Sequence, residues 1–253
     1  MPDVPVDLIR PQGLTPYEEA HALQLGLVEA LRQGRGRDTL VLVEHPPVIT
    51  LGRNADPAGV LVPGERLRAL GIGLHRVERG GQATYHGPGQ VVGYPVVRLR
   101  RLGLGVRAYV ERLEEVLIRT AAAYSVEARR VPGRPGVFCE QGKLAAIGVA
   151  VTRGVAYHGF AFNVRPDLAH FRLIVPCGLT DVAPTSLEAV LGRAPPVAEV
   201  AGVLAKEFSG VFGVRLVPPT PAPKASEVAR PQPPGRRGPG TAARVYGFST
   251  RDS

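Results

Sequence analysis

Apolar residues recur every three to four positions in several segments of the chain. This spacing places them on one side of an α-helix, so that the helix can pack one face against a core. It predicts helices over residues 15–34, 105–124, 186–192 and 196–212. In the first helix we expect Thr15 to be the N-cap, Pro16 to take the first helical position and Glu18 to complete a capping box. Either Thr185 or Ser186 is expected to cap the helix over 186–192.

Short apolar runs bounded by Gly, Pro or Asn alternate with these helices and predict strands. The predicted strands cover residues 38–45, 48–53 and 90–99, and a run at 64–78 predicts a short helix followed by a strand. Residues 136–164 predict three consecutive strands with tight turns at Gln141-Gly142 and Arg153-Gly154. The order of the elements is typical of an α+β, sandwich-like fold, with helices packed on a mixed, mostly antiparallel sheet.

The turn at Arg153-Gly154 predicts a register between the last two of these strands. A two-residue turn there places Val149 opposite His158. Because side chains alternate along a strand, Lys143 and His158 should project from the same face. We expect this face to form the floor of a pocket, although a structural sheet histidine is an equally simple interpretation of His158.

Length and cysteine usage limit the class of protein. The chain has 253 residues, 44% of them hydrophobic, which suits one well-packed core. It has no apolar run long enough to span a membrane, and the start, MPDVPVDLIR, lacks the features of a secretory signal. Two cysteines cannot build a disulfide framework, so we expect a cytoplasmic protein in a reducing compartment.

The net charge of +9 is distributed unevenly. From residue 218 onward there are six Lys or Arg and two Asp or Glu, which assigns +4 to this segment and +5 to the rest. We therefore predict one domain over residues 1–217 and a disordered Pro/Arg-rich tail over 218–253. An RNA-binding arm and a solubilising extension both fit the tail's composition. The mildly basic body suits acidic protein partners as well as phosphates.

Residues 79–95, RGGQATYHGPGQVVGYP, are unusually rich in glycine. Glycine destabilises regular elements, so such a cluster indicates either tight turns or close approach of the backbone to a ligand. Arg79 and His86 flank the glycines and favour a binding site. The spacing matches neither a phosphate-binding P-loop nor a dinucleotide fingerprint.

Lys143 and Cys177 are the strongest candidates for chemistry. The chain has 28 arginines and three lysines, and a lysine, unlike an arginine, can exchange its proton. Chance retention of Lys143 on a surface turn is the alternative. Cys177 lies between Pro176 and Gly178, outside any predicted element, whereas Cys139 falls within a strand and suits a buried, inert thiol. Neither cysteine has the spacing of a zinc or redox motif, and we predict no metal.

Five segments in this order resemble the octanoyltransferases of lipoate synthesis. They are HPPVITLGR (45–53), RGGQATYHGPGQVVGYP (79–95), GRPGVFCEQGKLAAIG (133–148), YHGFAFNV (157–164) and IVPCG (174–178). The resemblance covers roughly residues 5–215. Glu78 is a small departure, since an Asp is common at that position in the family.

The resemblance implies an acyltransferase with the fold of lipoate and biotin protein ligases. It implies transfer of an octanoyl group from octanoyl-acyl carrier protein to a lysine of lipoyl domains, those of 2-oxoacid dehydrogenase E2 subunits and of the glycine cleavage H protein. It assigns the acyl thioester to Cys177 and the tuning of that thiol to Lys143. The substrate-binding residues that it implies are Arg79, Gly80, Gly81, Gln82, Ala83, Thr84, Tyr85, His86, Ala146, Ile147, Gly148, Gly159, Phe160 and Ala161, with His158 in possible support. It implies no cofactor, no metal, no nucleic acid and no membrane.

Three other functions fit parts of the pattern. An ATP-dependent lipoate or biotin ligase of the same fold needs no cysteine nucleophile and has a nucleotide loop, to which GRGR at 34–37 bears only a weak similarity. A nucleic-acid-binding protein using the basic tail would interleave aromatic and basic residues, which the body does not. A Cys–His hydrolase would release free octanoate to water.

Overall fold

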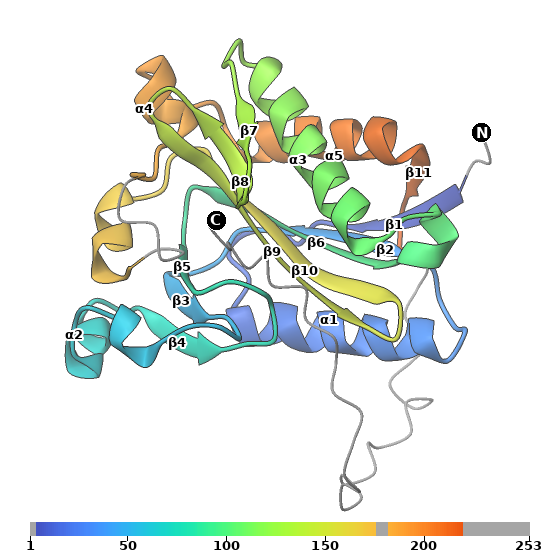
Figure 1. The fold of residues 1–253 in the computed structure, drawn as a ribbon, viewed down its shortest axis with the longest axis horizontal. Coiled ribbons are helices and arrows are strands. Elements are labelled where there is room, and N and C mark those ends of the chain that lie inside the picture. Colours follow the sequence, from blue (N-terminus) through green and yellow to red (C-terminus); the bar gives the residue numbers. More distant parts are fainter. Residues whose placement is uncertain (1–3, 176–181, 220–253) are drawn as a thin grey trace, which may run out of the picture.

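A large mixed sheet forms the centre of the molecule in the computed structural model, which describes residues 4–175 and 182–219. Nearly all of the predicted tail over 218–253, and Cys177, lie outside the described residues. The eight-stranded sheet has the order β11-β1-β2-β6-β10-β9-β8-β7 (Figure 1). The strands are β1 (Val4–Ile9), β2 (Thr39–Val43), β6 (Gln90–Arg98), β7 (Arg129–Val131), β8 (Arg134–Cys139), β9 (Gly142–Thr152), β10 (Val155–Asn163) and β11 (Val214–Val217).

Helices cover both faces of this sheet. Helix α1 (Tyr17–Arg32) crosses one face, and α3 (Val106–Ala122) and α5 (Val197–Phe212) pack side by side on the other (Figure 1). The short helices are α2 (Gly64–Ala69) and α4 (Leu187–Leu191), with 3₁₀ turns at Pro57–Gly59, Leu99–Leu102 and Leu168–Leu173. The expected α+β fold with a mixed, mostly antiparallel sheet is therefore confirmed, since β1 pairs in parallel with both β2 and β11 and the other pairs of this sheet are antiparallel.

A second sheet of three strands lies at one end of the molecule. It contains β3 (Val48–Leu51) between β4 (Gly73–Arg76) and β5 (Ala83–His86). Its own small core includes Ile49, Leu67 and Phe171, which are buried apart from the main core. This arrangement brings β5, the middle of the glycine-rich segment, beside the large sheet.

The predicted hairpin between β9 and β10 is confirmed in detail. Arg153 and Gly154 both have positive φ values, 47° and 81°, as a two-residue hairpin turn requires. Val149 pairs with His158 as the turn predicts. The turn between β8 and β9 is formed by Glu140 and Gln141, one residue earlier than predicted, because Gly142 already pairs with Cys139 as the first residue of β9.

The predicted cap of the first helix is wrong, whereas that of α4 is confirmed. Helix α1 begins at Tyr17 with Pro16 as N-cap, and no side chain caps it, so Thr15 and Glu18 do not form a capping box. At α4, the Ser186 side chain accepts a hydrogen bond from the N–H of Ala189. Strands β1, β5, β7 and β11 were not predicted, because each is short and all four lie at or next to a sheet edge.

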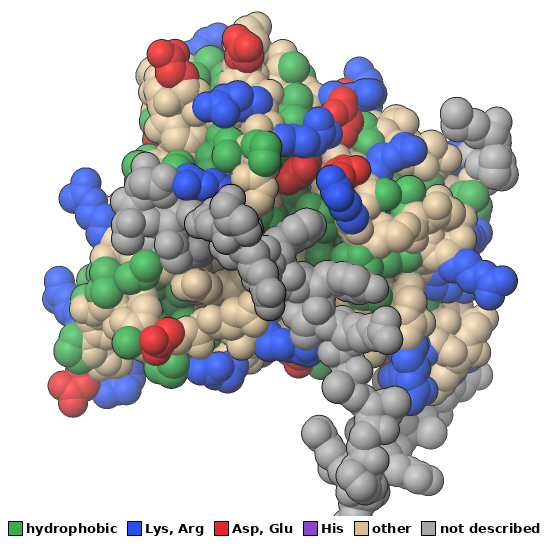
Figure 2. All heavy atoms as spheres, in the orientation of Figure 1, with side chains coloured by type: hydrophobic (Ala, Val, Ile, Leu, Met, Phe, Trp, Pro, Cys, Tyr) green, Lys and Arg blue, Asp and Glu red, His purple; other side chains and the backbone are tan. Residues whose placement is uncertain are grey.

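On the face of the molecule seen in Figure 2, basic side chains are scattered rather than gathered. Lys and Arg alternate with acidic and apolar side chains across the face shown in Figure 2. In the described part of the chain, no helix combines the length and apolarity needed to cross a bilayer.

Candidate functional site

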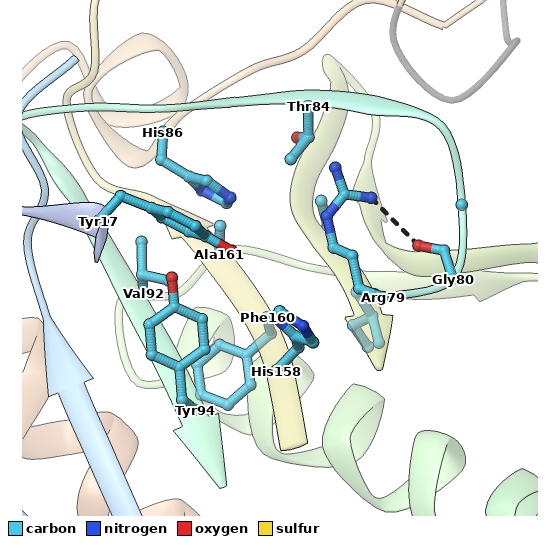
Figure 3. Close-up of a pocket in the computed structure, with 15 residues that line it drawn as sticks. Tyr17, Arg79, Gly80, Thr84, His86, Val92, Tyr94, His158, Phe160 and Ala161 are labelled. Carbon is cyan, nitrogen blue, oxygen red and sulfur yellow. Dashed lines mark hydrogen bonds between the residues drawn. The ribbon is translucent and has the colours of Figure 1, made fainter. Parts of the chain in front are cut away.

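A small pocket of about 40 Å³ opens where β5 and the loop before it meet β6, β9 and β10 (Figure 3). Its lining residues are Tyr17, Arg79, Gly80, Gly81, Thr84, His86, Val92, Tyr94, Ala146, Ile147, Gly148, His158, Gly159, Phe160 and Ala161. The three stretches expected to bind substrate, 79–86, 146–148 and 159–161, thus converge on one cavity although they lie far apart in the sequence.

Strand β5 divides the predicted binding residues between two environments. Thr84 and His86 face the pocket, whereas Ala83 and Tyr85 belong to the small core. The Tyr85 hydroxyl lies 2.8 Å from Nδ1 of His170, on the side away from the pocket. The alternation of a strand accounts for this division. Gln82 does not line the pocket either; its carbonyl accepts a hydrogen bond from the N–H of Gly52.

Arg79 is buried, and its guanidinium is hydrogen-bonded to the three-stranded sheet. Its guanidinium donates hydrogen bonds to the Thr50 carbonyl at 2.7 Å and to the Thr50 hydroxyl at 2.8 and 3.2 Å. A further bond at 3.1 Å reaches the carbonyl of Gly80 (Figure 3). Arg79 therefore shapes the loop at the rim of the pocket and connects it to β3.

Close packing within the protein accounts for part of the glycine pattern. A Cβ on Gly148 would lie 3.0 Å from Cδ of Arg79 and 3.1 Å from the carbonyl oxygen of Gly80. A Cβ on Gly87 would lie 2.0 Å from the hydroxyl of Tyr85. At both positions the protein's own atoms occupy the space, so packing explains these glycines without a ligand.

A chain of buried polar groups runs from the pocket to the start of β9. Nδ1 of His86 lies 3.3 Å from Oε1 of Gln90, whose Nε2 donates to Oδ1 of Asn163 at 2.9 Å. Asn163 in turn donates to the carbonyl of Thr185 at 2.8 Å, and the Thr185 N–H donates to the carbonyl of Lys143. Burial holds the pKa of His86 well below its ordinary value, so its ring is neutral.

His45 and Tyr94 form a second buried pair beside the pocket. Nδ1 of His45 donates to the carbonyl of Thr15 at 2.6 Å, so Nε2 accepts the hydrogen bond from the Tyr94 hydroxyl at 2.8 Å. Burial lowers the pKa of His45 to about 4. The ring is consequently neutral at pH 7 and holds the Tyr94 hydroxyl in a single orientation toward it.

His158 departs from the regular strand conformation. Its φ of 55° lies in the left-handed region, which a histidine adopts at an energetic cost. Buried Gln24 of α1 accepts the His158 N–H at 2.9 Å and supports this backbone. The ring stacks on His21 of α1, so it lies on the α1 side of the sheet, and Nε2 is 3.4 Å from Oε2 of Glu78.

Lys143 also departs from the regular alternation of side chains along a strand. The pairing of β8 with β9 shifts by one residue between Lys143 and Ala145, leaving Leu144 as the extra residue of a bulge. Lys143 consequently pairs with Phe138, and its Nζ lies 5.4 Å from the centre of that ring. Val137 packs in the core beneath α3, so Phe138 and Lys143 face the opposite side. Lys143 and His158 therefore share a face as predicted, but through two irregularities.

The segment that contains Cys177 is anchored on both described sides. The N–H of Val175 donates to the carbonyl of Gly59 at 2.8 Å. Ala183 accepts from the N–H of Lys143 at 2.9 Å, which places the chain that follows Cys177 directly beside the predicted catalytic lysine. The distance between Lys143 and Cys177 itself falls outside the described residues. Cys139 is buried and free, as expected.

Several residues of the site had no recognisable sequence signal. Tyr17, at the start of an ordinary amphipathic helix, lines the pocket together with Val92 and Tyr94. Asn163 joins the buried polar chain from the end of β10. Tyr94 and Asn163 lie within the quoted segments GYP and FNV, so those motifs marked their neighbourhood but not their contacts.

Solved structures define the class of fold. A bipartite lipoate protein ligase from Thermoplasma acidophilum is similar to this chain with a TM-score of 0.64 and 15% identity, covering 85% of this chain and 86% of that one. A lipoate-protein ligase A solved with ATP gives a TM-score of 0.61 at 18% identity, over 86% and 88% of the two chains. The lipoyl protein ligase A/B catalytic domain model matches residues 16–209.

Sequence relatives narrow this class. An octanoyltransferase of Alkaliphilus metalliredigens is 50% identical over 181 residues, covering 71% of this chain and 83% of the relative. That of Acidobacterium capsulatum is 46% identical over 220 residues, or 81% and 89% of the two chains. The chain belongs to the octanoyltransferase family, and it is an acyltransferase.

Proposed function

We propose that the protein transfers an octanoyl group from octanoyl-acyl carrier protein to a lysine of lipoyl domains, through a thioester on Cys177. The observation that carries this proposal is the convergence of residues 79–86, 146–148 and 159–161 on one pocket, with Lys143 on the same face of the sheet. The identity of 42–50% to curated octanoyltransferases supports the choice of acyl group. The mildly basic body suits acidic carrier and acceptor proteins, and we expect the reaction to occur in the cytoplasm.

In the first half-reaction, neutral Lys143 takes the proton of the Cys177 thiol. A free thiol is only a few per cent thiolate at neutral pH, so a neighbouring base raises the population of the nucleophile. The thiolate attacks the carbonyl carbon of the octanoyl thioester, and the carbon–sulfur bond to phosphopantetheine breaks. The Lys143 ammonium then protonates the departing sulfur.

In the second half-reaction, the amine of the acceptor lysine attacks the Cys177 thioester. Lys143 takes a proton from the attacking nitrogen, an amide bond forms and the Cys177 sulfur leaves. Lys143 returns the proton to this sulfur, which restores the starting enzyme. One thioester replaces another in the first half, and a more stable amide replaces a thioester in the second, so neither half needs ATP, a metal or a cofactor.

Intact-mass measurement on the full chain tests this mechanism. After mixing with octanoyl-acyl carrier protein and no acceptor, we expect one octanoyl adduct that maps to Cys177 and disappears when a lipoyl domain is added. Cys139→Ser is the matched control and should keep the adduct, because Cys139 is buried in the core.

Three results would contradict the mechanism. An adduct that survives Cys177→Ser places the acyl group elsewhere. Transfer of free octanoate that depends on ATP indicates the adenylate chemistry of a ligase, and release of octanoate without acceptor indicates a hydrolase.

A further inference from the structure

Three potential metal ligands meet at the wall of the pocket from separate segments. His21 comes from α1, Glu78 from the loop between β4 and β5, and His158 from β10. Nε2 of His21 lies 3.1 Å and Nε2 of His158 lies 3.4 Å from the same oxygen, Oε2 of Glu78. The donor atoms of all three lie within 4.8 Å of one another.

These separations are close to those of a zinc site. Zinc binds nitrogen and oxygen ligands at about 2.0–2.2 Å in tetrahedral geometry, which places neighbouring ligand atoms about 3.3–3.5 Å apart. Both separations between Glu78 and an imidazole are already near this value. From the 4.8 Å limit, the two imidazole nitrogens need to approach each other by at most about 1.5 Å. Two histidines and one carboxylate also match known three-ligand zinc sites, which leave one position open.

The surrounding structure holds His158, the least accessible of the three ligands, in place. The left-handed backbone of His158, supported by Gln24, turns its ring toward α1 and Glu78. The ring of His21 stacks on those of His158 and Tyr17, at centroid distances of 5.6 and 5.9 Å. Side chains of His21 and Glu78 are 21% and 43% exposed, so an ion can reach them from solvent.

The neighbouring charges permit a cation here. Arg79 is a nearby cation that acts on His158, and hydrogen bonds direct its guanidinium to Thr50 and Gly80. Zinc binds ionised carboxylates and neutral imidazoles. The His158 hydrogen bond favours the ionised form of Glu78, lowering its pKa to about 2, and burial favours the neutral form of His158.

We propose that His21, Glu78 and His158 bind a zinc-class transition-metal ion, which links α1, the Glu78 loop and β10 at the pocket wall. The ion takes no part in the acyl-transfer steps. Because Glu78 directly precedes Arg79 and Gly80, the bound ion would restrain the loop that lines the pocket.

Cobalt titration of the metal-free full-length protein tests the site, since Co²⁺ reports its ligands in the visible spectrum. We expect one equivalent of tetrahedral Co²⁺, displaced by Zn²⁺. Glu78→Gln and His21→Gln should each weaken binding by at least about tenfold. His75→Gln is the matched control: His75 also stacks on Tyr17 but pairs with Glu18 outside the cluster, so binding should persist.

Thermal unfolding supplies a second readout. At a free Zn²⁺ concentration about 100 times Kd, the wild-type melting temperature should rise by about 5–10 °C, and that of Glu78→Gln should not. Binding that persists in Glu78→Gln, or a thiolate-to-cobalt charge-transfer band that marks cysteine ligation, would overturn the proposal. Failure to bind Co²⁺ or Zn²⁺ would do the same and would show that the three side chains form an ion pair only. None of these three results bears on the Cys177 mechanism.

Discussion

The two faces of the eight-stranded sheet are built from the same strands but have opposite compositions. On the face covered by α3 and α5, the side chains of β6 and β10 include Val91, Phe160 and Phe162, all within one apolar core. On the other face, Tyr94 and His158 lie among buried histidines, Arg79 and the pocket. Alternation separates Val91 from Tyr94 along β6, whereas His158 of β10 reaches the pocket face only because its left-handed backbone breaks the alternation.

Because of this difference, one face of the sheet mainly stabilises the fold and the other carries the groups that can take part in chemistry. The α3/α5 face buries mainly apolar area, so it contributes mainly to the free energy of folding. The pocket face carries buried polar groups, and several of them are paired: His45 with Tyr94, and His86 with Gln90. Changes on the first face should therefore lower stability, and changes on the second should lower activity or alter its dependence on pH.

The largest expected effect is on activity, from replacing the predicted acid–base residue. Lys143→Ala should lower the rate of octanoyl transfer by about 10²–10⁴-fold, because the proton transfers lose their catalyst. The melting temperature should change little. The matched control, Lys206→Ala, removes an exposed lysine of α5 and should retain full transfer. Equal rates for both variants would show that Lys143 takes no part in proton transfer.

On the apolar face, Phe162→Ala should have the largest effect on stability. The Phe162 side chain is fully buried in the core beneath α3 and α5. Its truncation leaves a cavity and should lower the free energy of unfolding by about 3–5 kcal/mol, measured by urea denaturation. The transfer rate per folded molecule should stay near that of the wild type. A large loss of specific activity would mean that the two faces are not independent.

The buried imidazoles of the pocket face should make stability depend on pH. The folded-state pKa of His45 is about 4, below the 6.5 of the unfolded chain, so between these values the unfolded chain binds more protons. Stability is thus complete above about pH 6.5 and falls as the pH drops toward 4, by about 3 kcal/mol from this residue. Burial of His86 and His158 acts in the same direction.

Urea unfolding at a series of pH values measures this dependence. The slope of unfolding free energy against pH should be shallower in His45→Gln than in the wild type between pH 4 and 6.5. An identical slope in the two proteins would show that His45 does not titrate with unfolding.

The smallest expected effect comes from breaking the buried polar chain that connects His86 of the pocket to the backbone of Lys143. Asn163→Ala removes one of the two acceptors of Gln90 Nε2 and the Asn163 donor to the carbonyl of Thr185, at a cost of about 1–3 kcal/mol. Transfer should fall because Thr185 holds the segment next to Lys143. Asn163→Asp retains the acceptor for Gln90 but loses the donor to Thr185, so a loss of transfer in both variants assigns the effect to the Thr185 bond.

Much of the architecture followed from the sequence. Periodicity identified α1, α3 and α5, and turn chemistry at Arg153-Gly154 predicted the register of β9 with β10, because both signals arise within a few neighbouring residues. The glycine-rich motif and the other segments that carry the family resemblance identified the parts of the chain that line the pocket. The roles of Cys177 and Lys143 remain predictions.

Tertiary structure decided what local signals do not encode. Strand β1 and the edge strand β11 are defined by pairing between distant ends of the chain, and Tyr17 joins the pocket only because α1 crosses that face of the sheet. The bulge at Leu144 and the left-handed backbone of His158 depend on partners elsewhere in the fold. Spacing along a chain determines which side chains can share a face, but long-range packing selects where that regularity is broken. In this protein one break is at His158, which lines the pocket, and the other is at Leu144, two residues before the lining residue Ala146.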